Sequence, residues 1–143
     1  MYHYLESGLR NVWLVNGFTE RDTPYGRTIS ITNTDELHRA IGKAIASKAR
    51  LTGGELRFLR KELGLSQKSL AACIGSSEQN VSLWERRGRL PATANRLVRL
   101  LYLESTDGNV QVRKLLDRLN DLDNAERAPL HLRSARGHWR LAA

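Results

Sequence analysis

The segment Ser66 to Pro91 combines short hydrogen-bonding side chains with helical spacing. Its sequence, SQKSLAACIGSSEQNVSLWERRGRLP, predicts two short helices separated by Gly75, because glycine adopts the left-handed conformation of a tight turn most easily. The apolar spacing turns Val81 and Trp84 toward the inside of the second helix. A helix that only packs has no need of so many polar groups near its start, whereas one that enters a groove does. The outward side chains are Ser77, Glu78, Gln79, Ser82, Leu83 and Arg86.

The spaced pattern S-Q-x-x-L-A-x-x-x-G-x-S-x-x-x-V-S-x-W-E resembles the Cro/CI-type (XRE-type) helix-turn-helix family. The matching residues are Ser66, Gln67, Leu70, Ala71, Gly75, Ser77, Val81, Ser82, Trp84 and Glu85. The family's usual glycine two residues after the glutamate is replaced by Arg87, and Gly88 follows. The resemblance implies that the second helix enters the major groove of double-stranded DNA.

The same resemblance implies individual roles in DNA binding. Gln67 begins the first helix and is expected to bind a phosphate, since helix N-termini attract anions. Lys68 and Ser77 are further DNA-binding candidates. Gln79 can pair with adenine through two hydrogen bonds, and Ser82 can contact a base or a phosphate.

The remaining candidates lie on the same helix and just beyond it. Leu83 is expected to touch a thymine methyl group. Glu78 either accepts a hydrogen bond from a cytosine amine or holds Gln67 in place. Arginine forks match phosphate and position a protein without reading sequence. The expected phosphate contacts are Arg86, Arg87 and Arg89; for Arg87 and Arg89 a plain solvated surface remains an open alternative.

A wider frame surrounds this motif. A small β-containing segment, a helix, and the stretches LTGGELRFLRKELGLSQ and ATANRLVRLLYLE together resemble the MqsA-type antitoxin regulators. The best-known members carry an N-terminal zinc finger with four cysteines. This chain has the single cysteine Cys73, so no metal site is expected. The resemblance implies a protein toxin as an alternative partner, bound through residues 1–50.

The composition agrees with a polyanionic partner. The 143 residues are 41% hydrophobic and 27% charged, with a formal net charge of +8. Residues 53–104 are the most basic third, with nine Lys and Arg against five Asp and Glu. We expect a cytoplasmic protein that does not enter the membrane, because no apolar run approaches the roughly 20 residues of a bilayer span and no export signal begins the chain.

The elements expected around the motif give an α+β fold that is mainly α. Residues 11–31 predict two or three short antiparallel strands, with turns at Asn16-Gly17 and at Pro24-Tyr25-Gly26. Helical periodicity and capping patterns then predict helices over about 34–48, 53–63, 66–75, 76–87, 92–104 and 110–122. We expect a small N-terminal β-hairpin layer plus helix in 1–50, a five-helix helix-turn-helix domain in 51–122 and a C-terminal tail in 123–143.

Other residue types receive structural interpretations. Trp13 is expected in the core, and Cys73 as a small hydrophobe at a helix-packing seam. The four histidines, His3, His38, His131 and His138, show no metal-ligand spacing. Trp139 lies in the basic stretch ARGHWRLAA and either contacts DNA or a partner or belongs to an ordinary edge strand.

The sequence favours a sequence-specific transcriptional regulator that represses by occupying a promoter and that needs no cofactor. It shows no phosphate-binding glycine loop, metal cluster or nucleophile–base arrangement, so an enzyme is not expected. A homodimer on an inverted repeat is expected, because one motif reads only a few base pairs. The contact between the two chains is expected on helices 92–104 and 110–122. The alternatives are an antitoxin that also regulates its own operon, a protein-interaction module, and a packing unit that never meets DNA.

Overall fold

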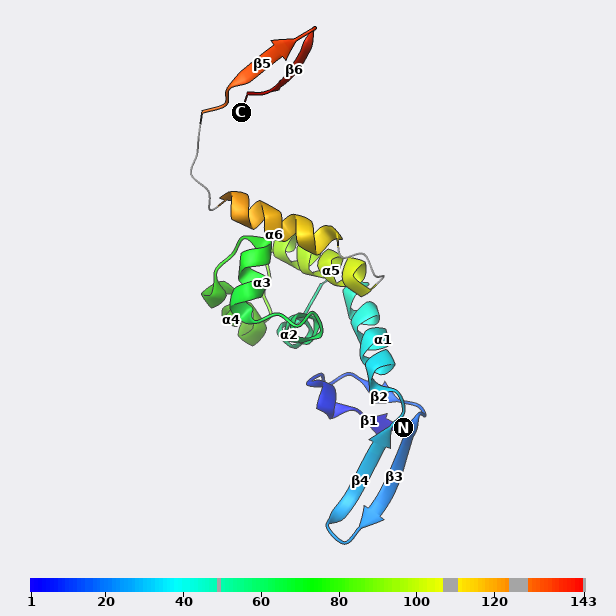
Figure 1. The fold of residues 1–143 in the computed structure, drawn as a ribbon. Helices are drawn as coiled ribbons and strands as arrows, with labels where there is room; N and C mark the ends of the chain where they lie inside the picture. Colours follow the sequence, from blue (N-terminus) through cyan, green and yellow to red (C-terminus); the bar gives the residue numbers. More distant parts are fainter. Residues whose placement is uncertain (49, 107–110, 124–128, 143) are drawn as a thin grey trace.

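The computed structural model describes residues 1–48, 50–106, 111–123 and 129–142, and it is a mixture of helices and small antiparallel sheets (Figure 1). The N-terminal elements are β1 (Tyr2–His3), the short 3₁₀ helix η1 (Leu5–Ser7), β2 (Trp13–Leu14), β3 (Phe18–Thr23) and β4 (Gly26–Ile31). The helices that follow are α1 (Thr34–Ala46), α2 (Gly53–Glu62), α3 (Gln67–Ile74), α4 (Glu78–Arg87), α5 (Ala92–Thr106) and α6 (Gln111–Asp123). The last two elements are β5 (Leu132–Ala135) and β6 (His138–Leu141). The expected α+β class is confirmed.

The N-terminal strands form two separate two-stranded sheets. β1 pairs with β2, and β3 pairs with β4 from Phe18 opposite Ile31 to Thr23 opposite Gly26. The Pro24-Tyr25 turn is therefore a hairpin turn, as expected. The expected hairpin at Asn16-Gly17 is wrong, because this dipeptide connects strands of different sheets. A type I′ turn needs positive φ at both residues, and here only Gly17 has it, at 80°.

Side-chain caps start the helices where the sequence predicts them. Asn33 caps α1 by accepting a hydrogen bond from the Glu36 N–H. Thr52 and Glu55 form a complete capping box at α2. The Glu55 carboxylate is 2% exposed, and its second oxygen accepts a 2.7 Å hydrogen bond from Lys48 Nζ. These caps satisfy the first backbone N–H groups of each helix, which have no partner inside the helix.

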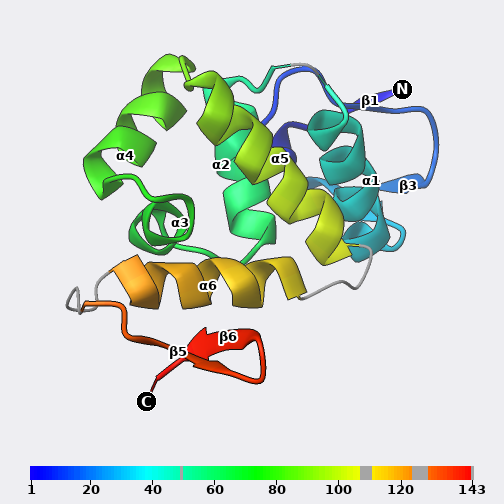
Figure 2. The same ribbon diagram turned by 90° about the horizontal axis from the view of Figure 1, so that it is seen from above.

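One hydrophobic core joins the N-terminal segment to the helices. Its fully buried centre contains side chains of α2, α3, α4 and α5, and it extends to strand and α1 residues. The main centre residues are Leu56, Leu59, Leu70, Val81, Val98 and Leu101. Helix α6 contacts α3 and α5, and Figure 2 shows it running beneath them. Helix α4 contacts α2 and α3 with its inner side, and its outer side is exposed at Gln79 and Arg86.

Trp13 does not lie in the core, contrary to expectation. Successive residues of a strand point to opposite faces, and in β2 Leu14 takes the buried face. Trp13 is 55% exposed, and its ring stacks on that of His3 with the centroids 3.9 Å apart. The two-residue strand therefore places an aromatic pair on the surface.

The C-terminal stretch contains a hairpin that the lack of sequence period did not predict. β5 and β6 pair antiparallel around Arg136-Gly137, and both turn residues have positive φ. Trp139 belongs to β6 and is 72% exposed. Of the two interpretations of this residue, the edge strand therefore agrees with its local structure. Figure 1 shows the hairpin standing apart from the helices.

Candidate nucleic-acid interface

The connection between α3 and α4 has the geometry of a tight helix-turn-helix. Gly75 ends α3 in the left-handed conformation, with φ of 70°. The N–H of Ser76 then donates to the carbonyl of Ala71 at 2.8 Å, which closes the helix end. Ala71 is 3% exposed, and its small side chain lets the two helices cross closely. The sequence predicted this role for Gly75.

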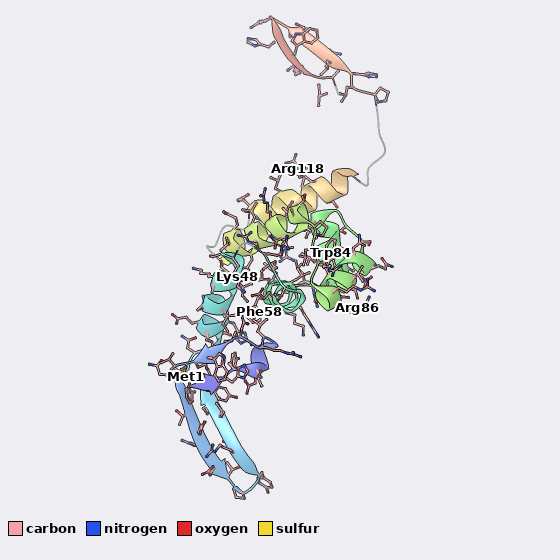
Figure 3. The ribbon with its side chains drawn as sticks, turned by 180° about the vertical axis from the view of Figure 1, so that it is seen from behind. Met1, Lys48, Phe58, Trp84, Arg86 and Arg118 are labelled. Carbon is pink, nitrogen blue, oxygen red and sulfur yellow. The ribbon has the colours of Figure 1, made fainter. Side chains whose placement is uncertain are left out.

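Helix α4 buries one face and presents the other. Val81 is fully buried, and Trp84 packs half-buried against the core. Residues three, four and seven positions apart lie on one side of a helix, so Gln79, Leu83 and Arg86 share the opposite face. Gln79 and Arg86 are exposed there, and Figure 3 shows Arg86 at the outer side of the molecule. Ser82 lies half-buried beside them.

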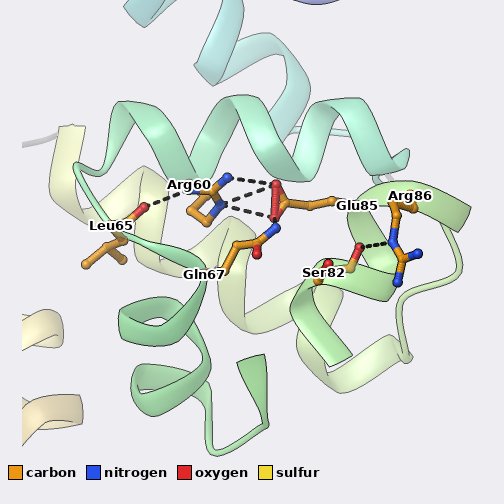
Figure 4. A network of polar contacts seen from close by, with 6 residues as sticks. All are labelled: Arg60, Leu65, Gln67, Ser82, Glu85 and Arg86. Atoms are coloured by element: carbon orange, nitrogen blue, oxygen red, sulfur yellow. Dashed lines mark hydrogen bonds and ion pairs between the residues drawn. The ribbon is translucent and has the colours of Figure 1, made fainter. Parts of the chain in front are cut away.

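A buried ion pair ties α4 to the helices behind it (Figure 4). The guanidinium of Arg60 on α2 donates from Nη2 to Glu85 Oε1 at 2.9 Å and from Nε to Oε2 at 3.1 Å. Its Nη1 donates to the Leu65 carbonyl at 3.0 Å. The side chains of Arg60 and Glu85 are only 11% and 5% exposed. A guanidinium that donates two hydrogen bonds to one carboxylate fixes the relative orientation of the two side chains as well as the distance between them.

Gln67 joins the same network. Its Nε2 donates to Glu85 Oε2 at 3.1 Å, so Glu85 links α2, α3 and α4 through one carboxylate. The interpretation that Glu78 holds Gln67 in place is therefore wrong. Glu78 is exposed at the first position of α4, and Glu85, two turns further along the same helix, accepts the hydrogen bond from the Gln67 amide. The side chain of Gln67 is thus fixed at the start of α3.

Serine side chains organise both helix starts. The Ser66 and Ser77 hydroxyl oxygens accept hydrogen bonds from the Ser69 and Asn80 N–H groups, at 3.0 Å and 3.2 Å. Ser77 is therefore the N-cap of α4. Asn80 is exposed next to Gln79, and its Nδ2 donates to Ser76 Oγ at 3.2 Å. The sequence reasoning omitted Asn80, although a polar amide beside Gln79 was a signal for it.

Basic side chains flank the outer face of α4. Arg86 Nε donates to the Ser82 carbonyl at 3.4 Å, which leaves the outer guanidinium nitrogens directed away from the helix (Figure 4). Arg87 is the last residue of α4, and Arg89 follows Gly88; both are exposed. Lys68 is exposed in the first turn of α3. The exposed cations thus lie at the C-terminal end of α4 and in the first turn of α3, which contacts α4 at Glu85.

The backbones of α2 and α4 meet at a glycine. A Cβ at Gly53 would lie 2.8 Å from the Trp84 carbonyl oxygen and closer still to that of Glu85. Neither oxygen belongs to a flexible side chain, so only glycine permits this approach. The C-terminal end of α4 therefore rests directly on the first residue of α2, which fixes its height above the core.

The titratable groups near the motif show no reactive site. Burial raises the pKa of the Cys73 thiol, and the Asp117 carboxylate, 3.7 Å from the sulfur, raises it further. A thiol held protonated in this way is a poor nucleophile. Within the described part of the chain, no three His, Cys, Asp or Glu side chains are grouped as metal ligands. None of the helices described is long and apolar enough to cross a bilayer.

Comparisons with known proteins agree with this geometry. Residues 56–101 match the HTH_3 family model, described as helix-turn-helix, which spans most of α2, all of α3 and α4, and most of α5. Searches of curated proteins and of solved structures return no match. The matched segment is about a third of the chain. Residues 56–101 are thus similar to helix-turn-helix domains of the XRE type, and this similarity supports a DNA-binding transcriptional regulator.

Proposed function

We propose that this protein is a sequence-specific regulator that binds an operator in double-stranded DNA as a homodimer and represses by occupying it. The observation that carries the proposal is the outer face of α4, which presents exposed Gln79 together with exposed Arg86; Arg87 ends the helix, and exposed Lys68 lies in the first turn of α3. The major groove admits an α-helix, and a glutamine there can donate to and accept from adenine. Cations at the edges suit the phosphates on either side.

The proposed roles fall into two groups: some residues recognise bases, and others bind phosphates and so position the protein on the duplex. Gln79 pairs with a base, Ser82 contacts a base or phosphate, and Leu83 meets a thymine methyl group. Glu78 accepts from a cytosine amine, and Ser77 and Gln67 approach the phosphate backbone at the helix starts. The network around Glu85 supports these roles because it fixes α4 relative to Gln67. Arg86, Arg87 and Arg89 bind phosphates.

The exposed leucines of α5 and α6 support a dimer. Leu100 is 48% exposed beside an apolar groove on α5, which Ala92, Thr93, Arg96 and Leu97 also line. On α6, Leu115 and Leu119 are 56% and 46% exposed. Leu115 and Leu119 are four residues apart and so share one side of α6, and large apolar side chains grouped on a surface favour a protein interface. A dimer through these helices carries two copies of α4 and so reads two half-sites.

Selection from a random duplex pool tests the proposal. We expect an inverted repeat whose half-site centres lie roughly 10 base pairs, or a multiple of that, apart, because a two-fold dimer presents its reading helices to one side of the duplex. Equilibrium sedimentation of the complex should show two chains on each site. Enrichment of an unpaired half-site, or a monomer with full affinity, would contradict the dimer; no enrichment at all would contradict sequence-specific binding.

A second candidate is an antitoxin that binds a protein toxin through residues 1–50. The observation that favours it is an apolar groove between β2 and α1, lined by Val12, Trp13, Leu37, Ala40 and Ala44 among others. Trp13 and the neighbouring Val15 are 55% and 77% exposed. Co-purification from native cells tests this candidate. A stoichiometric protein partner that is lost in Trp13→Ser supports it, and recovery of the protein without any partner contradicts it.

A further inference from the structure

The C-terminal hairpin of β5 and β6 carries positive charge without any compensating carboxylate. Residues 129–142 include Arg133, Arg136 and Arg140 together with two histidines, and they contain no Asp or Glu. Every residue of both strands is exposed. The hairpin is therefore a cationic surface presented to solvent.

The strand register concentrates this charge on one face. Arg133 lies directly opposite Arg140, and Ala135 lies opposite His138. The next pairs along, Leu132 with Leu141 and Ser134 with Trp139, point to the other face because side chains alternate along a strand. One face is thus basic, and the other is mainly apolar. Like charges directly opposite each other destabilise an antiparallel pair, so Arg133 and Arg140 oppose the pairing that the free hairpin needs.

In the other hairpin of the same chain, β3–β4, an arginine is paired with carboxylates. On β3 and β4, the guanidinium of Arg27 lies 3.4 Å from carboxylate oxygens of both Glu20 and Asp22. Those ion pairs are internal to the hairpin and neutralise its charge. The contrast shows that an exposed hairpin of this protein can balance its own arginines, and that β5–β6 does not. A polyanion bound to the basic face supplies the missing negative charge.

We propose that the basic face of β5–β6 is a second DNA-contacting element, in which Arg133 and Arg140 bind phosphates of the duplex that α4 reads. This proposal rests on the DNA binding proposed above and adds a surface outside the helix-turn-helix domain. Arginine forks match phosphate oxygens with paired hydrogen bonds, and a two-stranded ribbon fits the dimensions of the major groove. Such contacts add affinity for any sequence, not preference for one.

The double variant Arg133→Thr/Arg140→Thr tests the proposal in the full-length protein. Threonine keeps the β propensity of both strands, and no buried side chain is disturbed. In the proposed homodimer the double variant loses four phosphate contacts, two in each chain, so the slope of log affinity against log salt should fall by about 3.6. Between 50 and 200 mM salt, the wild type should then lose roughly a hundredfold more affinity than the variant, on cognate and scrambled duplexes alike.

Arg21→Thr/Arg27→Thr on β3–β4 is the matched control, since it removes the same charge from a hairpin that carries its own carboxylates. This control should retain the wild-type slope. Equal slopes for the wild type and the Arg133/Arg140 variant would overturn the proposal while leaving α4 as the DNA-binding element. Loss of slope in both variants would overturn it as well, because the effect would then be one of net charge. A protein that binds no duplex at all would overturn the proposed function together with this inference.

Binding to vesicles separates DNA from an anionic membrane as the partner of this face. Vesicles of phosphatidylserine and phosphatidylcholine provide anionic headgroups without nucleic acid. We expect no difference between wild type and the Arg133/Arg140 variant in vesicle co-sedimentation. If the variant instead loses vesicle binding and keeps the wild-type salt slope on DNA, the hairpin is a membrane-surface element and the DNA assignment is wrong.

Discussion

Replacing Glu85 by Ala should lower the free energy of unfolding by about 3–5 kcal/mol. The substitution leaves the Arg60 guanidinium, 11% exposed, without its carboxylate, and it removes the acceptor of the Gln67 amide. An unpaired buried charge costs far more than the pair contributes. Urea unfolding followed by circular dichroism measures the change.

Two further variants show whether the loss of stability comes from the buried ion pair. Glu78→Ala removes an exposed carboxylate from the first turn of the same helix, so it should cost less than about 1 kcal/mol. Arg60→Met/Glu85→Leu removes both buried charges and should recover much of the loss. If Glu85→Ala costs no more than Glu78→Ala, the network does not hold α4 in place.

Gly53→Ala should destabilise the protein by about 1–3 kcal/mol or more, because the added methyl group meets two backbone carbonyl oxygens of α4. Alanine ordinarily stabilises a helix relative to glycine, so the expected sign is the reverse of the usual one. The neighbouring Gly54→Ala is the control. A Cβ there meets nothing closer than 3.7 Å, and it should be neutral or stabilising by up to about 1 kcal/mol. Thermal melting of the two variants decides the matter: equal shifts would show that α2 and α4 are not in backbone contact.

Local signals in the sequence were enough to predict the elements that form the interface. The capping pattern of Thr52 with Glu55, the left-handed Gly75 and the apolar spacing of Val81 and Trp84 all act within a few residues of one another. Each of these patterns favours one local backbone structure, and the folded protein adopts that structure. The positions of Gln79 and Arg86 on the outer face follow directly from that helix.

The features that the sequence reasoning missed depend on partners distant in the chain. Arg60 falls on the apolar stripe of α2, four residues after Leu56, and Glu85 follows Val81 on α4 in the same way. Two opposite charges on two buried stripes were a signal for an ion pair, but only the packing of α2 against α4 shows that they meet. The exposure of Trp13 likewise depends on which face of β2 covers the core. The β5–β6 turn uses Arg136-Gly137, which is not among the dipeptides that favour a hairpin.

We propose that α4 reads bases through Gln79 while the arginines beyond it bind phosphates. The most direct test compares Gln79→Ala with Arg87→Ala on cognate and scrambled duplexes at two salt concentrations. Gln79→Ala should cost roughly 1–3 kcal/mol on the cognate duplex only and relax the preference at one position in each half-site. Arg87→Ala should weaken binding to both duplexes equally and reduce the salt slope by roughly one for each phosphate contact that is lost, one in each chain of the dimer. If both variants lose affinity uniformly on both duplexes, α4 does not read sequence and the assignment of the site is wrong.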